Sequence, residues 1–300
     1  LLYCGIYVLP LHCLWSTRLL PSRSRDDPQL IQARVRAVSF STTACSLITY
    51  LILRHLSIMT GTELSSGSTY PIVVSRSALH LMGYWPPGIL ETAKASLLTA
   101  LLFAGPIYER LFFEGLWKQW LQLRPLTLLW EDWPTWRNII AGPITEECLF
   151  RSSSIPLLLH TNAKLSSIIF RSPLVFGIAH LHHFLEFRTS YPNTPLVSAI
   201  ARSAFQLSYT AIFGVYATFV FLRTGSLLAT ICVHLICNSL GLPRLWGAVE
   251  PYWLIRYDSN CCPERIIWTV SYYIILAGGI LLWWSNLFSL TLSFEALVTF

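Results

Sequence analysis

Long apolar runs alternate with short polar connections along this chain. Runs of about 17–25 mostly apolar residues are long enough to cross a bilayer as helices. Eight segments fit the pattern, each bounded by charged residues or by Pro- and Gly-rich stretches: 1–20, 37–59, 95–113, 138–159, 165–184, 198–222, 226–242 and 265–287. The pattern predicts an all-α fold, a polytopic membrane bundle of about eight transmembrane helices.

Two connections are long enough to need a description of their own. Residues 60–91 are rich in Ser, Gly, Thr and Pro and predict a loop, with an interfacial turn at 84–87. Residues 125–136 hold three Trp, an acidic pair and Pro134, which is typical of a segment at the membrane surface. No internal repeat is visible, so we expect a single integral-membrane domain over 1–300.

Composition supports a membrane protein. The 300 residues are 54% hydrophobic and 12% charged, whereas soluble domains carry about 25% charged residues. The net charge of +6 resides mainly in the short connections, where it indicates topology and not a nucleic-acid partner. The eight Cys include no CxxC pair, so no disulfide framework is expected. The sequence begins at Leu1 inside an apolar run, which is consistent with a truncated N-terminus.

The distribution of arginine predicts which ends of the spans face the cytosol. Connections 18–36 and 109–137 are rich in Arg and Lys, and the positive-inside rule places both there. Following the spans from these connections puts four polar side chains at a similar depth in the cytosolic half of the bilayer: Glu146, His180, His234 and Asn238. The side chains of a single active site must lie at a similar depth on the same side of the membrane.

The most informative motif is residues 142–151, GPITEECLFR, which carries three charges inside an apolar run. A charge at the centre of a spanning helix costs roughly 2.5–3.5 kcal/mol on insertion scales, so such groups are usually paired or functional. Glu147 and Arg151 are four apart and predict an ion pair, while Glu146 points elsewhere and is free to act as a base. The alternative is a purely structural salt-bridge cluster. One Glu–Arg pair would suffice for that, and the second glutamate would then be an unpaired charge that is costly to place in the membrane.

Two further motifs supply imidazole and amide groups. Residues 176–183, FGIAHLHH, place His180 where it could face Glu146, whereas His182 and His183 are interpreted as interfacial hydrogen-bonding residues. His234 and Asn238 lie four apart on one face of an apolar helix. They are either interhelical hydrogen-bond partners or neutral donors for a developing oxyanion.

Together these three motifs resemble those of the type II CAAX prenyl endopeptidases. Residues 208–214 and 223–226 also look like the connecting stretch of the eukaryotic members, so the resemblance covers at least the core over 137–243. The resemblance implies an endoplasmic-reticulum membrane protease whose active site faces the cytosol. Such a protease removes the last three residues from farnesylated or geranylgeranylated CAAX proteins, of the kind that small GTPases provide.

The resemblance also implies roles for the site residues. Glu146 and His180 would activate the attacking water, His234 and Asn238 would stabilise the oxyanion, and Glu147 and Arg151 would orient the others. No cofactor is implied. The expected partners are prenylated C-termini and the lipid bilayer.

Two other interpretations remain open at this point. Glu146, His180 and His234 are acceptable zinc ligands, so the same proteolysis could depend on zinc. In a different class, a non-enzymatic membrane scaffold or transporter could use the charged groups as a proton or ion path.

Overall fold

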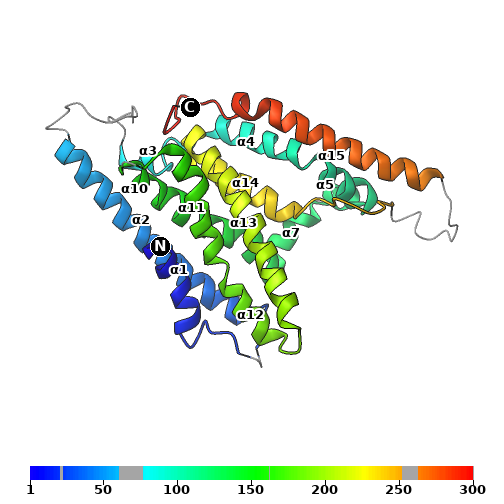
Figure 1. Cartoon of the computed structure of the whole chain (residues 1–300), viewed down its shortest axis with the longest axis horizontal. Helices are drawn as coiled ribbons and strands as arrows, with labels where there is room; N and C mark the ends of the chain where they lie inside the picture. The colour runs from blue at the N-terminus through cyan, green and yellow to red at the C-terminus, as the bar shows by residue number, and fades with distance from the viewer. Residues whose placement is uncertain (21–22, 61–76, 162, 252–262, 300) are drawn as a thin grey trace.

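The computed structural model describes residues 1–300 except 21–22, 61–76, 162, 252–262 and 300, and every element in this part of the chain is helical (Figure 1). The all-α class predicted from the sequence is confirmed. The longest helices are α2 (Pro28–Thr60), α13 (Leu196–Thr224) and α15 (Pro263–Leu290). Their outer faces expose large apolar side chains, as helices in contact with lipid do; examples are Leu51, Ile200 and Leu281.

The predicted count of about eight spans is not confirmed. By length and composition, four helical segments of the described chain can cross a membrane, over 28–58, 165–190, 196–224 and 265–290. A fifth forms if α4 (Ile89–Leu102) is joined with the 104–113 segment that follows, across a bend of 80°. The two remaining apolar helices, α1 (Leu2–Cys13) and α14 (Leu227–Leu240), are shorter than a full span.

The predicted fourth span, 138–159, is broken into short pieces. In order these are η2 (Arg137–Ala141), α9 (Gly142–Glu147), η3 (Cys148–Ser153) and α10 (Ile155–Leu159), where η denotes a π-helix. Pro143 and Pro156 lie in the first turns of α9 and α10, where their missing N–H groups are tolerated. π-Helical turns are rare overall but frequent at functional sites, and here two of them flank the Glu146–Glu147 pair.

Similar interruptions shape the neighbouring segments. The third predicted run turns after Leu102 and continues as α5 (Ala104–Tyr108), which contains Pro106, and η1 (Glu109–Phe113). The fifth breaks at His180 and Leu181, between α11 (Leu165–Ala179) and α12 (His182–Ser190). A histidine of the second motif therefore lies at a helix end.

The connections contain more helix than their composition predicted. Within the predicted loop, residues 61–76 lie outside the described part, and the remainder includes α3 (Ala78–Leu81) and a cis peptide bond between Trp85 and Pro86. The predicted interfacial segment forms α7 (Arg124–Glu131) and α8 (Trp133–Trp136), preceded by α6 (Leu116–Leu121).

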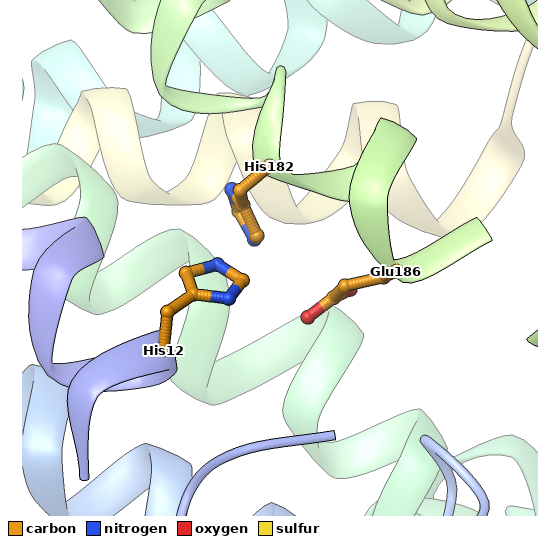
Figure 2. A group of neighbouring side chains, drawn as sticks. All are labelled: His12, His182 and Glu186. Atoms are coloured by element: carbon orange, nitrogen blue, oxygen red, sulfur yellow. The ribbon is translucent and has the colours of Figure 1, made fainter. Parts of the chain in front are cut away.

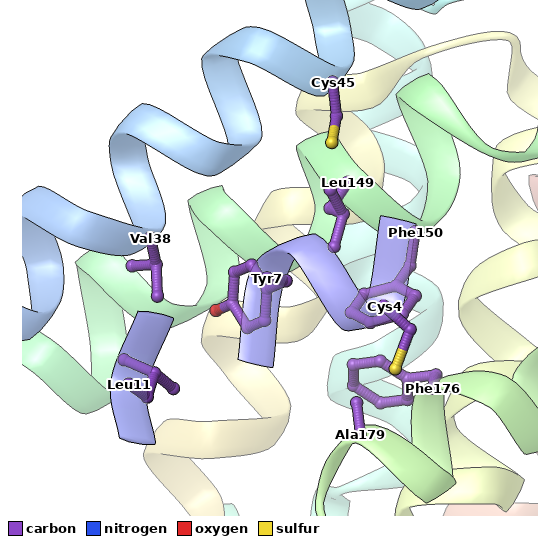
Figure 3. Close-up of a cluster of buried hydrophobic side chains, with 9 residues drawn as sticks. All are labelled: Cys4, Tyr7, Leu11, Val38, Cys45, Leu149, Phe150, Phe176 and Ala179. Atoms are coloured by element: carbon purple, nitrogen blue, oxygen red, sulfur yellow. The ribbon is translucent and has the colours of Figure 1, made fainter. Parts of the chain in front are cut away.

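Helix packing brings the motif segments together in the middle of the molecule. α11 lies along α13, and α4 contacts both α14 and α15 (Figure 1). α1 packs against α2 and α11 through a cluster of buried apolar side chains that also includes η3 (Figure 3); its members are Cys4, Tyr7, Leu11, Val38, Cys45, Leu149, Phe150, Phe176 and Ala179. This cluster anchors η3, which directly follows the Glu146–Glu147 pair.

Candidate active site

Glu147 and Arg151 form the ion pair that their spacing predicted. Arg151 Nη1 donates to Glu147 Oε1 at 2.9 Å, and the two side chains are 1% and 0% exposed. Arg151 Nη2 also donates to the carbonyl of Gly214 at 3.3 Å, and the guanidinium stacks 4.6 Å from the ring centroid of Phe176. The arginine therefore joins η3 to α11 and α13 and gives the buried carboxylate a fixed position.

His234 connects the two glutamates. Its Nδ1 donates to Glu147 Oε1 at 2.7 Å, and its Nε2 lies 3.9 Å from Glu146 Oε2. The ring packs 4.4 Å from the centroid of Phe213. Because Glu147 accepts from Nδ1, the imidazole presents Nε2 on the side of Glu146; a carboxylate on one ring nitrogen commonly orients a functional histidine in this way.

His180 has a fixed tautomer for a different reason. Its Nδ1 lies 2.8 Å from the carbonyl oxygen of Phe176, and a carbonyl can only accept, so Nδ1 carries the proton. The residue follows the last turn of α11, where carbonyl groups lack helical partners. Nε2 is thereby left with its lone pair available to accept a proton.

Asn238 lies one turn after His234 on α14 and uses one of its two amide hydrogens locally. Nδ2 donates to the carbonyl of Asn138 at 2.9 Å, which links α14 to η2. The side chain is exposed to the cavity, so its second N–H remains available.

Glu146, His180, His234 and Asn238 line one cavity of about 1560 Å³. Its walls are largely apolar and include aromatic side chains from α11, α13 and α15: Phe170, Phe176, Phe205, Tyr209, Phe213, Tyr216, Phe219, Trp283 and Trp284. Glu147 and Arg151 lie behind this wall. The structure thus gathers all six predicted residues, four at the cavity and two beneath it.

One neighbour of the site was missed by sequence reasoning. The hydroxyl of Tyr7 on α1 lies within hydrogen-bond distance of Thr145 Oγ1, at 3.2 Å, and both residues line the cavity beside Glu146. Tyr7 precedes Thr145 by 138 positions and belongs to no motif. From sequence alone, a tyrosine in an apolar run that lines a site cannot be distinguished from one that packs in the core.

His182 and His183 make the local hydrogen bonds expected of them. His182 Nδ1 donates to the carbonyl of Ala179 at 2.5 Å, and His183 Nδ1 donates to Glu186 at 2.9 Å. Ligand-type atoms of His12, His182 and Glu186 lie within 4.8 Å of one another (Figure 2). Glu186 is already neutralised, because Arg34 Nη1 donates to its Oε1 at 2.6 Å.

The geometry does not favour the zinc interpretation of the predicted site. Within the described residues, the group in Figure 2 is the one set of three His, Cys, Asp or Glu side chains close enough to share an ion. Glu146, His180 and His234 do not form such a group. Since Glu146 and His234 are 3.9 Å apart, it is His180 that lies too far away.

Comparison with known proteins places the chain in a family. The sequence model of the type II CAAX prenyl endopeptidase Rce1-like family matches residues 128–240. A Schizosaccharomyces pombe protein described as a probable CAAX prenyl protease 2 is 33% identical over 290 residues, 94% of this chain and 89% of its own length. Human CAAX prenyl protease 2 is 34% identical over 247 residues, 79% of this chain and 68% of its own.

An Arabidopsis thaliana CAAX prenyl protease 2 is 39% identical over 168 residues, which cover 50% of this chain and 53% of that protein. No solved structure matches the chain. The chain belongs to the Rce1-like type II CAAX prenyl endopeptidases and is a multi-pass membrane enzyme that hydrolyses peptide bonds. The family resemblance predicted from the three motifs is confirmed.

Proposed function

We propose that this enzyme removes the C-terminal tripeptide from farnesylated or geranylgeranylated CAAX proteins, cutting after the prenylated cysteine. The observation that carries the proposal is the arrangement of Glu146 and His180, whose carboxylate and free Nε2 line the same cavity. Two groups able to accept a proton from water, set beside two potential hydrogen-bond donors, suit hydrolysis of an amide.

In the proposed reaction, a water molecule held by Glu146 and His180 attacks the scissile carbonyl carbon. Its proton passes to Glu146 as the new C–O bond forms, and the carbonyl oxygen becomes an oxyanion. When the C–N bond breaks, the proton passes from Glu146 to the leaving amine. General acid–base catalysis of this kind contributes typically 10²–10⁴-fold to the rate.

The oxyanion would lie against His234 and Asn238. Asn238 has one N–H beyond the bond that it makes to Asn138. His234 already donates from Nδ1 to Glu147, so it can donate from Nε2 only when the ring carries both protons. Glu147, which also accepts from Arg151, is the residue that orients the ring of His234.

The lipid on the substrate accounts for the aromatic walls of the cavity. A prenyl chain bound beside α13 and α15 would stay in apolar surroundings while the peptide reaches the polar end. The family resemblance implies the endoplasmic-reticulum membrane. We place the site on the cytosolic side because the Arg-rich connections border the same cavity through Arg25 and Arg137. Substrates of the small-GTPase kind present such a C-terminus at that face.

The direct test is release of the tripeptide from a farnesylated CAAX peptide by membranes that contain the protein. Wild type is compared with Glu146→Ala and Glu146→Gln, and with Glu114→Gln as a control, since Glu114 is exposed and does not line the cavity. We expect both Glu146 variants to lose at least 10²-fold in kcat and the control to keep full activity.

Two added arms separate the alternatives. A strong zinc chelator should leave the wild-type rate unchanged; loss of activity that zinc restores, together with loss of bound metal in His234→Ala, would establish the zinc mechanism instead. If correctly folded wild type cleaves nothing, and Glu146→Ala leaves the biological phenotype unchanged, the scaffold or transporter interpretation takes its place. Cleavage elsewhere in the peptide, or equal turnover without the prenyl group, would also contradict the proposal.

A further inference from the structure

Four arginines line the cavity that holds the candidate catalytic groups: Arg25, Arg34, Arg137 and Arg202. Of the described residues in this wall, Glu146 is the one that carries a carboxylate. The enzyme therefore places a strongly basic surface in the same hollow as its apolar, aromatic walls. Neither water activation nor binding of a prenyl chain requires it.

The positive charges of these arginines are only partly balanced. Arg34 donates to Glu186 at 2.6 Å, and Arg25 approaches the same carboxylate at 3.9 Å. Arg137 donates to Asp26 at 3.0 Å. Arg202 stacks 4.6 Å above the ring of Phe187 and has no carboxylate partner in the described part of the chain. Two carboxylates thus serve four guanidinium groups, which leaves an excess of two positive charges.

Arg34 also has an unused donor. Its Nε donates to the carbonyl of Thr17 at 2.8 Å and its Nη1 to Glu186, which fixes the plane of the guanidinium. Its Nη2 is buried and finds no hydrogen-bond acceptor among the described residues. A buried donor without a partner costs about 1–3 kcal/mol, and a bound anion would supply the missing acceptor. The residue is itself 9% exposed.

We propose that Arg25, Arg34 and Arg202 bind the free C-terminal carboxylate of the substrate. This inference rests on the proposed function, in which the bond that is cut lies three residues from the chain end. An extended tripeptide spans about 10 Å, so a carboxylate held at a fixed place in the cavity sets which carbonyl reaches Glu146. Guanidinium groups suit this task because their forked donors match both oxygens of a carboxylate.

A consequence is that the enzyme measures its cleavage position from the end of the chain. Adding one residue after the CAAX sequence would move the carboxylate by about 3.5 Å in an extended peptide, and either the carboxylate or the scissile carbonyl would then be misplaced. The phosphate of a lipid headgroup offers the same anionic chemistry from the bilayer. The test must therefore distinguish a peptide carboxylate from a lipid phosphate.

The experiment compares two farnesylated CAAX peptides, one ending in the free acid and one in the carboxamide. Both kcat/KM for cleavage by the intact protein and Kd for binding to the Glu146→Gln protein are measured. Wild type should favour the acid by about tenfold or more in both quantities, the range expected for a charge-assisted hydrogen bond. Arg202→Gln, Arg25→Gln and their double variant should bring the acid-to-amide ratio toward one, mainly through KM.

Arg171→Gln is the matched control, since Arg171 is an exposed arginine outside the cavity, and it should keep the wild-type ratio. Equal Kd values for acid and amide in the Glu146→Gln protein would overturn the inference. A lipid-binding role would give a different result. The Kd values for acid and amide would be equal, and phosphatidylglycerol in the vesicles would raise the activity of wild type but not that of Arg202→Gln. The arginines would then be assigned to lipid phosphate. Absence of cleavage by wild type with a retained acid preference in Kd would overturn the proposed function and leave the carboxylate site standing.

Discussion

Glu147 is the side chain on which the polar groups of the site converge. One oxygen, Oε1, accepts from both Arg151 and His234, so a single buried carboxylate fixes a cation on one side and an imidazole on the other. The pair and the histidine lie in different helices. Mutations can therefore separate the role of Glu147 in stability from its role in orienting His234.

We expect Glu147→Leu and Arg151→Leu each to lower the free energy of unfolding by about 3–5 kcal/mol, because each leaves a buried charge without its partner. The double variant should lose clearly less than the sum of the two. Its tripeptide release should nevertheless stay low, since His234 has lost its acceptor. Thermal unfolding in detergent and peptide cleavage are measured on the same samples; additive losses of stability would contradict the coupling.

His180 is expected to affect the chemical step and little else. Replacing it by Ala removes the free Nε2 and should lower kcat by about 10²–10⁴-fold with a small change in KM. His160→Ala serves as the control, because that exposed histidine does not line the cavity. A fall confined to KM would instead make His180 a substrate-binding residue.

Sequence reasoning could anticipate contacts within one helix turn but not those between helices. The Glu147–Arg151 pair follows from a spacing of four, and Pro143 is itself a sequence signal for the start of a helix or a kink in one. The bond from His234 to Glu147 joins positions 87 apart, and the Tyr7–Thr145 contact joins positions 138 apart. Both depend on which helices pack together, and hydropathy does not determine that.

At the scale of elements, the close crossing of α11 and α13 positions the arginine of the site. A Cβ added at Gly214 would lie 2.7 Å from the Cβ of Pro173 and 3.4 Å from Arg151 Nη2. The carbonyl of the same glycine accepts a hydrogen bond from that arginine. Small residues allow helix backbones to approach in this way inside membranes.

Gly214→Ala should therefore destabilise the fold by about 1–3 kcal/mol, the usual cost of overpacking, and should reduce activity by displacing Arg151. Gly278→Ala provides the comparison: it lies in α15 with nothing within 4 Å of its added Cβ, so the substitution should be neutral or slightly stabilising. Melting temperatures and cleavage rates of the two variants are compared. Equal behaviour would show that the crossing is not tightly packed.

The interruptions of the helices explain why the count of spans differs from the hydropathy pattern. An apolar run shows only that a segment is shielded from water. Its hydropathy is the same whether the backbone forms one helix or several short ones. Residues 138–159 form four short pieces, and the 89–113 run bends by 80° at its break, although hydropathy alone predicted a single span in each place. Broken helices at membrane depth are tolerated where they are buried in protein or line a cavity, and the Glu146 segment does line one.

At the scale of the whole molecule, the cavity joins an apolar surface to a polar one. Its aromatic wall includes Trp284 of α15, which is 69% exposed, while its basic surface includes Arg25 and Arg137 near the N-terminal connection. A substrate with a lipid and a peptide in one molecule matches both surfaces. Affinity should then depend on the aromatic wall, and the chemical step should depend on Glu146 and His180.

Trp284→Ala tests whether the aromatic wall contributes to affinity and not to the chemical step. We expect KM for a farnesylated peptide to rise about three- to thirtyfold with little change in kcat, because the substitution removes apolar contact made equally in the ground state and the transition state. Trp246→Ala is the control, since Trp246 is also exposed but does not line the cavity. A geranylgeranylated peptide should show a similar or larger rise. If kcat falls and KM does not change, the tryptophan positions the scissile bond, and the prenyl chain must bind elsewhere along the aromatic wall.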